Sequence, residues 1–159
     1  MKRTAVLLGL ALALFSFIFT ACKNDKNPVA VNEFGEISGT VNFVGAWPAA
    51  GDVQVSIWSS WPPAGPPAAA SDALTSNNNS ATYKLDGLQK GTYPVMTVGW
   101  RDPQNPTGAK VIGIYWAQSD SLGVDASGNV TAAPQAIVID NSQMVYSNVV
   151  VKANLDIIK

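Results

Sequence analysis

Alternation of apolar and polar residues recurs along the chain after residue 35 and predicts short β-strands. Residues 36–44 alternate in this way, and one phase consists of Ile37, Gly39, Val41 and Phe43. Residues 53–58 repeat the pattern, with Val53, Val55 and Ile57 facing inward. The remaining strands are expected at residues 81–85, 92–101, 111–116, 136–139 and 146–155. About seven strands without helical periodicity predict an all-β protein, an antiparallel β-sandwich with the strands in two packed sheets.

Residues 83–100 form the centre of this pattern. They predict a strand, a turn that carries Gly87 and Gly91, and a second strand. That second strand and the strand at 111–116 are apolar on both phases, so something must cover their outer face. The residues assigned to this outer face are Met96, Val98, Ile112 and Ile114. Two kinds of cover are possible: another segment of the chain, either the proline-rich loop or the C-terminal segment, or another molecule. We expect the chain to cover this face itself.

The N-terminus predicts the destination of the protein. Lys2 and Arg3 precede an apolar run over residues 5–19, which is too short to cross a bilayer and typical of a signal peptide. The following F-T-A-C resembles the lipobox of bacterial lipoproteins, which implies acylation of Cys22. The alternative is an ordinary signal peptide with a cysteine near its end. We expect a signal peptide at 1–21, a lipidated flexible tether at 22–35 and one β domain at 36–159, carried on the bacterial envelope, with the outer membrane favoured and the leaflet open.

Acylation would have physical consequences. Each buried methylene contributes about 0.8 kcal/mol, so several acyl chains would hold the protein on a membrane, whereas one would not. Cys22 is the only cysteine, and with it acylated no thiol remains for a disulfide. The domain must therefore be stabilised by packing alone.

Composition excludes several functions. The chain has no histidine, which removes Ser-His-Asp and Cys-His catalysis and histidine-based zinc sites. Charged residues are 13% of the chain and the net charge is −1, so binding to nucleic acid is not expected. The polar stretch at 119–131 contains Asp120 and Asp125 but lacks the spacing of a helix-flanked calcium loop. A solvated turn is the preferred interpretation, and no cofactor or metal is expected.

Two segments resemble a known family. The strand I-S-G-T-V-N-F and the later Y-K-L-D-G-L-Q-K-G-T-Y-P-V are similar to the carboxypeptidase regulatory-like or transthyretin-like β-sandwich domains. The matching positions are Ile37, Gly39, Val41, Leu85, Gly87, Leu88, Gly91 and Tyr93. The resemblance implies an immunoglobulin-like or transthyretin-like sandwich that serves as an accessory module.

Tryptophan is the residue type that best suggests a binding surface. Five tryptophans are many for a small secreted β domain, and flat indoles stack on sugar faces and proline rings. The candidate binding residues are Trp58, Trp61, Trp100 and Trp116. Each has packing as its alternative role, and Trp61 in particular could pin the proline-rich loop at 59–80 onto the domain. This loop is either functional or disordered, and its proline pairs place it on the surface or along a sheet edge.

Three functions remain open. The first is a membrane-anchored, non-catalytic binding or structural module with protein or carbohydrate contacts, and the second is an accessory subunit of an envelope assembly. The third is a hydrolase with a carboxylate pair. The candidate carboxylates are Asp86, Asp102, Asp120, Asp125 and Asp140. All five lie in or beside turns, where aspartate supports the backbone, so we do not expect an enzyme.

Overall fold

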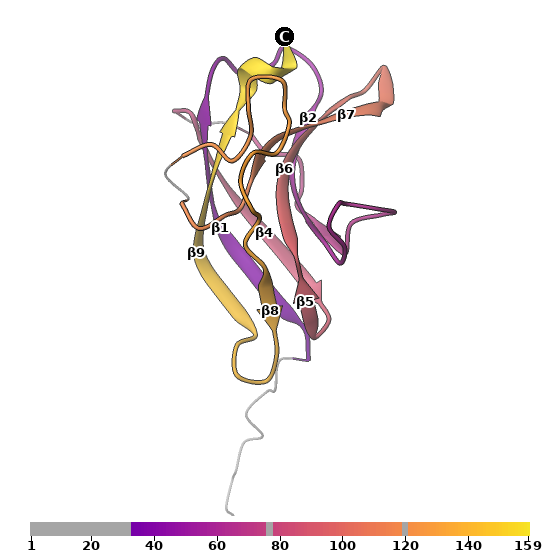
Figure 1. Ribbon diagram of the computed structural model, residues 1–159, viewed down its shortest axis with the longest axis vertical. Coiled ribbons are helices and arrows are strands. Elements are labelled where there is room, and N and C mark those ends of the chain that lie inside the picture. Colours follow the sequence, from indigo (N-terminus) through magenta and orange to yellow (C-terminus); the bar gives the residue numbers. More distant parts are fainter. Residues whose placement is uncertain (1–32, 76–77, 119–120) are drawn as a thin grey trace, which may run out of the picture. The chain divides into compact units, whose positions relative to one another are not determined.

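The computed structural model describes residues 33–75, 78–118 and 121–159, and in this part of the chain the protein is all-β (Figure 1). The strands are β1 (Gly35–Val44), β2 (Asp52–Trp58), β3 (Ala69–Ala70), β4 (Ser80–Leu88), β5 (Gly91–Tyr93), β6 (Val95–Asp102), β7 (Asn105–Ile114), β8 (Ile137–Ile139) and β9 (Val145–Asn154). A single 3₁₀ turn, η1 (Leu155–Ile158), follows β9. No helix in the described residues is long and apolar enough to cross a membrane. The signal peptide, the Cys22 acylation site and most of the tether lie outside the described residues.

Each of the seven predicted strands has a counterpart, with two differences. The strand predicted at 111–116 is β7 and begins earlier, because Asp102 pairs with Asn105 and the intervening residues form a tight hairpin turn. The strand predicted at 92–101 is divided into β5 and β6 at Pro94, which has no N–H to donate to a ladder. The other boundaries differ by a few residues at most.

The pairing of the strands differs from the predicted sandwich of two antiparallel sheets. The main sheet has seven strands in the order β3-β2-β6-β7-β9-β1-β4, and a second sheet pairs only β5 with β8. The prediction of antiparallel pairing throughout is wrong, because β1 runs parallel to β9. The main sheet nearly closes on itself, since β3 at one edge lies near β4 at the other.

Residues 83–100 are therefore not a hairpin around which the rest is arranged. β4 pairs with β1 at one edge of the main sheet, whereas β6 pairs with β2 and β7 in its middle. β5 lies between them in sequence and pairs with β8 in the small sheet. The chain thus crosses from one side of the domain to the other within this stretch.

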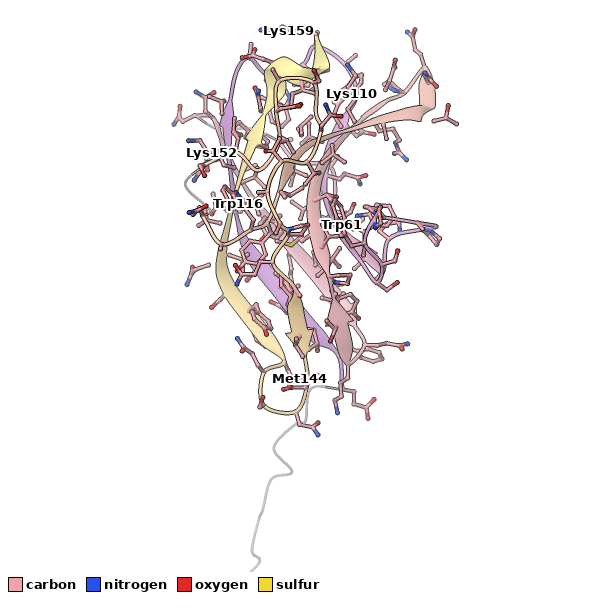
Figure 2. All side chains as sticks on the ribbon, in the orientation of Figure 1. Trp61, Lys110, Trp116, Met144, Lys152 and Lys159 are labelled. Atoms are coloured by element: carbon pink, nitrogen blue, oxygen red, sulfur yellow. The ribbon has the colours of Figure 1, made fainter. Side chains whose placement is uncertain are left out.

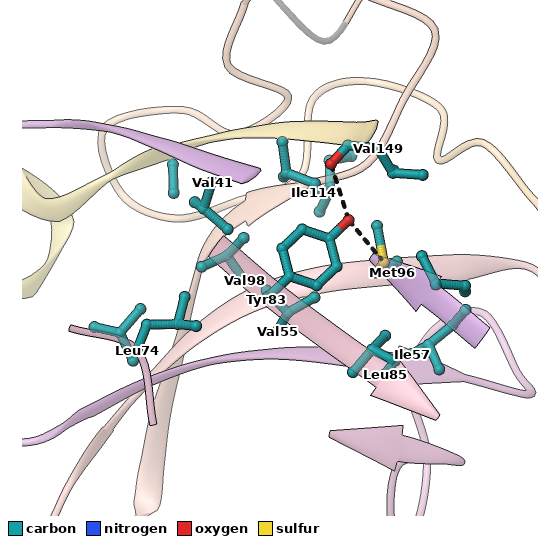
Figure 3. Packing of buried hydrophobic residues seen from close by; sticks show 14 of the residues in the cluster. Val41, Val55, Ile57, Leu74, Tyr83, Leu85, Met96, Val98, Ile114 and Val149 are labelled. Carbon is teal, nitrogen blue, oxygen red and sulfur yellow. Dashed lines mark hydrogen bonds between the residues drawn. The ribbon is translucent and has the colours of Figure 1, made fainter. Parts of the chain in front are cut away.

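The core is built from buried side chains of both the main sheet and the small sheet, and Figure 3 shows part of it. The side chains assigned to an uncovered outer face are inside it: Met96, Val98, Ile112 and Ile114 are at most 1% exposed. The face assignment was therefore wrong, but the expectation that the chain covers these residues itself is confirmed. They leave no apolar face for a partner to cover.

The proline-rich segment runs along β2 rather than away from the domain. Its backbone N–H groups donate to β2 carbonyl groups, from Ala68 to Ile57 at 2.8 Å and from Ser71 to Val55 at 2.9 Å. The Leu74 side chain at its end is buried. The predicted position along a sheet edge is therefore confirmed, and this segment extends the sheet beyond the two residues of β3.

Candidate binding surface

A hollow on the outer face of β2, β6 and β7 is the best candidate for a binding site, and we call it the face groove. Its volume is about 240 Å³, and it is lined by Asp52, Gln54, Ser56, Trp58, Pro67, Thr97, Gly99, Trp100, Arg101, Ala109, Lys110 and Val111. The inward phase of β2 fills the core, so the alternate residues of this strand point into the groove. Pairing places Gln54 opposite Gly99 and Ser56 opposite Thr97.

The floor of the groove is hollow because Gly99 has no side chain. A Cβ atom added there would have the Lys110 carbonyl oxygen, 3.7 Å away, as its nearest neighbour. A glycine in the middle of a strand weakens it and often marks a bulge, and here the register of β6 with β7 shifts between Val98 and Gly99. Gly99 opens the space between Gln54 and the β7 side of the groove.

Polar groups line this floor. The Gln54 amide donates to the Ser71 carbonyl at 2.9 Å, and the Trp58 indole N–H donates to Thr97 Oγ1 at 3.1 Å. Within the part of the chain that the structure describes, the Gln54 Oε1 atom and the Ser56 hydroxyl form no hydrogen bond with the protein. Neither residue is buried, so both groups can be reached from outside. An acceptor and a hydroxyl are therefore free to bind a ligand.

The walls of the groove are apolar and its end is charged. Trp58 and Pro67 form a wall at one end of the groove, and Trp100 lies near the other end. There Arg101 Nη2 lies 3.5 Å from Asp52 Oδ2, and both side chains are about half exposed, so the pair adds little stability. Lys110 Nζ donates to the Ile157 carbonyl at 2.9 Å. A flat ring with polar edges fits this arrangement.

A second hollow, the rim cleft, adjoins the groove at Trp100. It has a volume of about 370 Å³ and is lined by Ala46, Trp47, Pro48, Ala49, Ala50, Trp100, Leu155, Ile158 and Lys159. The Trp47 indole is 37% exposed and packs edge-on against Phe43, with ring centroids 5.1 Å apart. The Trp100 indole N–H donates to the Ala50 carbonyl at 3.1 Å, which fixes the ring between the two hollows.

The four tryptophans predicted to bind a ligand thus divide into two groups. Trp58 and Trp100 line the same groove, as a shared binding surface requires. Trp61 is 42% exposed on the proline-rich loop and lines neither hollow. Trp116 is half-buried against the core and donates to the Ser121 carbonyl at 3.2 Å, so it has the alternative packing role (Figure 2 labels both).

Two residues of this surface were not predicted. Trp47 is the fifth tryptophan, and the only signal for it is its position before Pro48 in the turn that closes the first predicted strand. Gly99 carries no signal, because its importance comes from the residues that surround it after folding. Sequence periodicity cannot identify such a residue.

Three of the five candidate carboxylates, Asp102, Asp125 and Asp140, stabilise turns. Asp102 accepts from the Gln104 N–H at 2.8 Å, and Asp140 accepts from the Ser142 hydroxyl at 2.6 Å. Hydrogen bonds, chiefly from the Asn129 side chain, lower the pKa of Asp125, and those from Ser142 lower the pKa of Asp140. Asp86 lies in β4, and Asp120 is outside the described residues. Among the residues described, no group of three His, Cys, Asp or Glu side chains is placed to hold a metal ion.

Comparison of the chain with protein-family models, curated proteins and solved structures gives no significant match. The chemistry of the face groove must therefore be inferred from its geometry. Two indoles, a proline ring and a polar floor are suited to binding a ring-shaped ligand.

Proposed function

We propose that this protein is a lipid-anchored, non-catalytic binding module of the bacterial cell envelope, and that its face groove binds a saccharide. The observation that carries the proposal is the combination of Trp58 and Trp100 with an open polar floor at Gly99. A sugar ring has an apolar face and a polar rim of hydroxyl groups. The indoles suit the apolar face of the sugar, and the free Gln54 and Ser56 oxygens suit its hydroxyl groups.

The location of the surface in the domain supports this role. The tether joins the domain at Gly35, which is the first residue of β1. The residues of the rim cleft begin just after Val44, which is the last residue of β1. At about 3.3 Å per residue, these two ends of β1 are roughly 30 Å apart. The tryptophan surface thus extends to the end of the domain that is far from the anchor.

We also propose that the domain is related to the transthyretin-like β-sandwiches. The apolar residues that carry the family resemblance are all buried: Ile37, Val41, Leu85, Leu88 and Tyr93. Gly87 has φ of +68°, a conformation that favours glycine, near the end of β4. These roles support the resemblance, although the seven-stranded mixed sheet departs from two separate sheets.

The saccharide proposal is tested with a substitution that fills the groove. Gly99→Val should fold normally, because a Cβ there has ordinary contacts, and it should abolish binding to glycans that the unchanged protein binds. Gly91→Val is the matched control, since a Cβ at Gly91 meets no atom within 4 Å and lies outside the groove. Binding is measured by tryptophan fluorescence and calorimetry against envelope polysaccharides. Equal binding by both variants, or no binding to any saccharide in a broad panel, would refute the proposal.

The anchor is tested separately at Cys22. Cys22→Ser should leave a protein that lacks the mass of acyl chains and appears in the aqueous phase of a detergent partition, whereas the unchanged protein enters the detergent phase. A membrane-bound Cys22→Ser protein would favour the alternative of an ordinary signal peptide that is retained. This result would leave the saccharide proposal untouched.

An accessory role in an envelope assembly is the second candidate, and the rim cleft is the observation that favours it. The cleft is mainly apolar, and Trp47 exposes more than a third of its surface there. Crosslinking in intact cells from a photoreactive residue at position 47 should then capture a protein. A crosslinker at position 61 is the control, because Trp61 has similar exposure outside the cleft.

A further inference from the structure

Exposed apolar side chains gather at the end of the domain where the tether arrives. Phe34 is 53% exposed and Val145 is 48% exposed, and with the half-buried Met144 they form what we call the basal patch. β1 and β9 start side by side in parallel, with Glu36 opposite Val145, and the Glu36 N–H donates to the Met144 carbonyl at 2.8 Å. Figure 1 shows the starts of both strands at this end, and Figure 2 labels Met144 there.

The small sheet adds a third exposed apolar residue to this end. Val138 points outward from β8 and is 42% exposed, while its neighbours Ile137 and Ile139 are buried. The Tyr146 hydroxyl donates to the Val138 carbonyl at 2.8 Å and so ties β8 to the start of β9. Of the six large apolar side chains exposed in the described residues, three therefore belong to this end.

The fold does not require these side chains to be apolar. None of the three belongs to the buried core cluster or to the residues that pack against it. Exposed positions on strands accept polar residues readily, and apolar residues that gather at one end of a domain indicate a contact. The partner must be one that reaches this end.

We propose that the basal patch rests on the surface of the lipid bilayer, so that the domain is held with the face groove away from the membrane. This inference rests on the proposed acylation of Cys22. Only the eleven residues 23–33 separate that cysteine from Phe34. Even fully extended, eleven residues span at most about 40 Å, so the patch is never far from the lipid headgroups. A contact too weak to bind a free protein becomes populated at such a high effective concentration.

The charges around the patch indicate an apolar contact rather than electrostatic attraction. Glu36 is paired with Lys84 at 2.8 Å, and the Asp140 carboxylate accepts hydrogen bonds within its own turn. In the sequence that leads into and out of this end, the single cation Lys90 is outnumbered by the acidic Glu33 and Asp86, so these residues add no excess of cations to bind anionic lipids. The contact should therefore persist when the salt concentration is raised.

The test uses two matched positions at opposite ends of the domain. In the acylated protein on vesicles of phosphatidylethanolamine and phosphatidylglycerol, a polarity-sensitive dye is attached at Val145→Cys or at Val44→Cys. Val44 is 40% exposed at the far end of β1 and is the control. We expect a blue shift and quenching by nitroxide lipids for the dye at 145 and neither for the dye at 44. Adding Phe34→Glu should abolish the shift at 145, whereas adding Trp61→Glu should not.

The outcomes separate the two proposals. Equal signals from positions 145 and 44 in protein that floats with the vesicles would overturn the orientation and leave the anchor intact. Protein that does not float would refute the acylation, and the inference would fall with it. A signal at 145 that disappears in high salt would replace the apolar contact with an electrostatic one and would also overturn the proposal.

Discussion

The hydroxyl of Tyr83 donates to the backbone carbonyl of Val149 at 3.1 Å, although their strands β4 and β9 are separated by β1 (Figure 3). Gly39 of β1 pairs with both residues, and its missing side chain lets the phenol pass over the strand. The carbonyl belongs to an irregular stretch of β9, where Asn148 has φ of +60° and the register with β1 shifts. Three strands are thereby fixed at one point.

Gly39→Ala should prevent this arrangement. A Cβ at position 39 would clash with the Val149 carbonyl oxygen and would lie 2.6 and 2.8 Å from two further backbone atoms of Val149, which cannot move away as a side chain could. We expect a loss of at least about 3 kcal/mol in the free energy of unfolding, or no folding, on the scale of severe packing and backbone defects. Urea denaturation followed by circular dichroism measures this.

Gly91→Ala is the control for Gly39→Ala. A Cβ at Gly91 meets no atom within 4 Å, and its change in stability should stay within about 0.5 kcal/mol, as for ordinary surface substitutions. Equal effects at the two positions would contradict the close approach of Gly39 to β9. They would indicate a general preference for glycine in these strands.

Tyr83→Phe tests the hydrogen bond itself. The phenol is buried, and burial, with a smaller contribution from Tyr115, raises its pKa. Removing the hydroxyl leaves the Val149 carbonyl without this partner in the core, which costs about 1–3 kcal/mol. Tyr146→Phe removes a hydroxyl that donates to the exposed Val138 carbonyl, where water replaces it, so its effect should be smaller. A larger loss for Tyr146→Phe in urea denaturation would refute this account.

The strands could be predicted because their signal is local. Alternation of apolar and polar residues identified β1 and β2 almost to their ends, since one face of each is buried. The parallel pairing of β1 with β9 could not be predicted, because it joins residues about 110 positions apart and includes the irregular stretch at Asn148. Alternation is the same in parallel and antiparallel strands when one face is exposed.

The binding surface was predictable only in part for the same reason. Trp58 stands out in the sequence by residue type and lies at the end of a strand, and the structure places it in the face groove. Met96 was assigned to the wrong face because β6 is apolar on both phases, so alternation gives no direction. Gly99 became recognisable only when Gln54 and Lys110 were placed around it.

Acid should destabilise the domain through its turns. Hydrogen bonds depress the pKa of Asp140 below the ordinary 3.8, so its carboxylate stabilises the fold above that value and loses this contribution as the pH falls through the lower folded value. Asp140→Asn removes the titration and should flatten the fall of the urea midpoint between about pH 5 and pH 2. Identical profiles for Asp140→Asn and the unchanged protein would show that this turn does not contribute.

Trp58 should contribute more to ligand binding than any other residue of the face groove, because its indole forms a wall and is held by its N–H bond to Thr97. Aromatic stacking contributes about 0.5–1.5 kcal/mol beyond the area that it buries, so Trp58→Ala should weaken saccharide binding by about tenfold or more. Trp58→Phe keeps a flat ring but loses the N–H donor, and its effect should be intermediate. Trp61→Ala, outside the groove, should bind like the unchanged protein in the same calorimetric titration. Weaker binding by Trp61→Ala than by Trp58→Ala would move the site from the sheet face to the proline-rich loop.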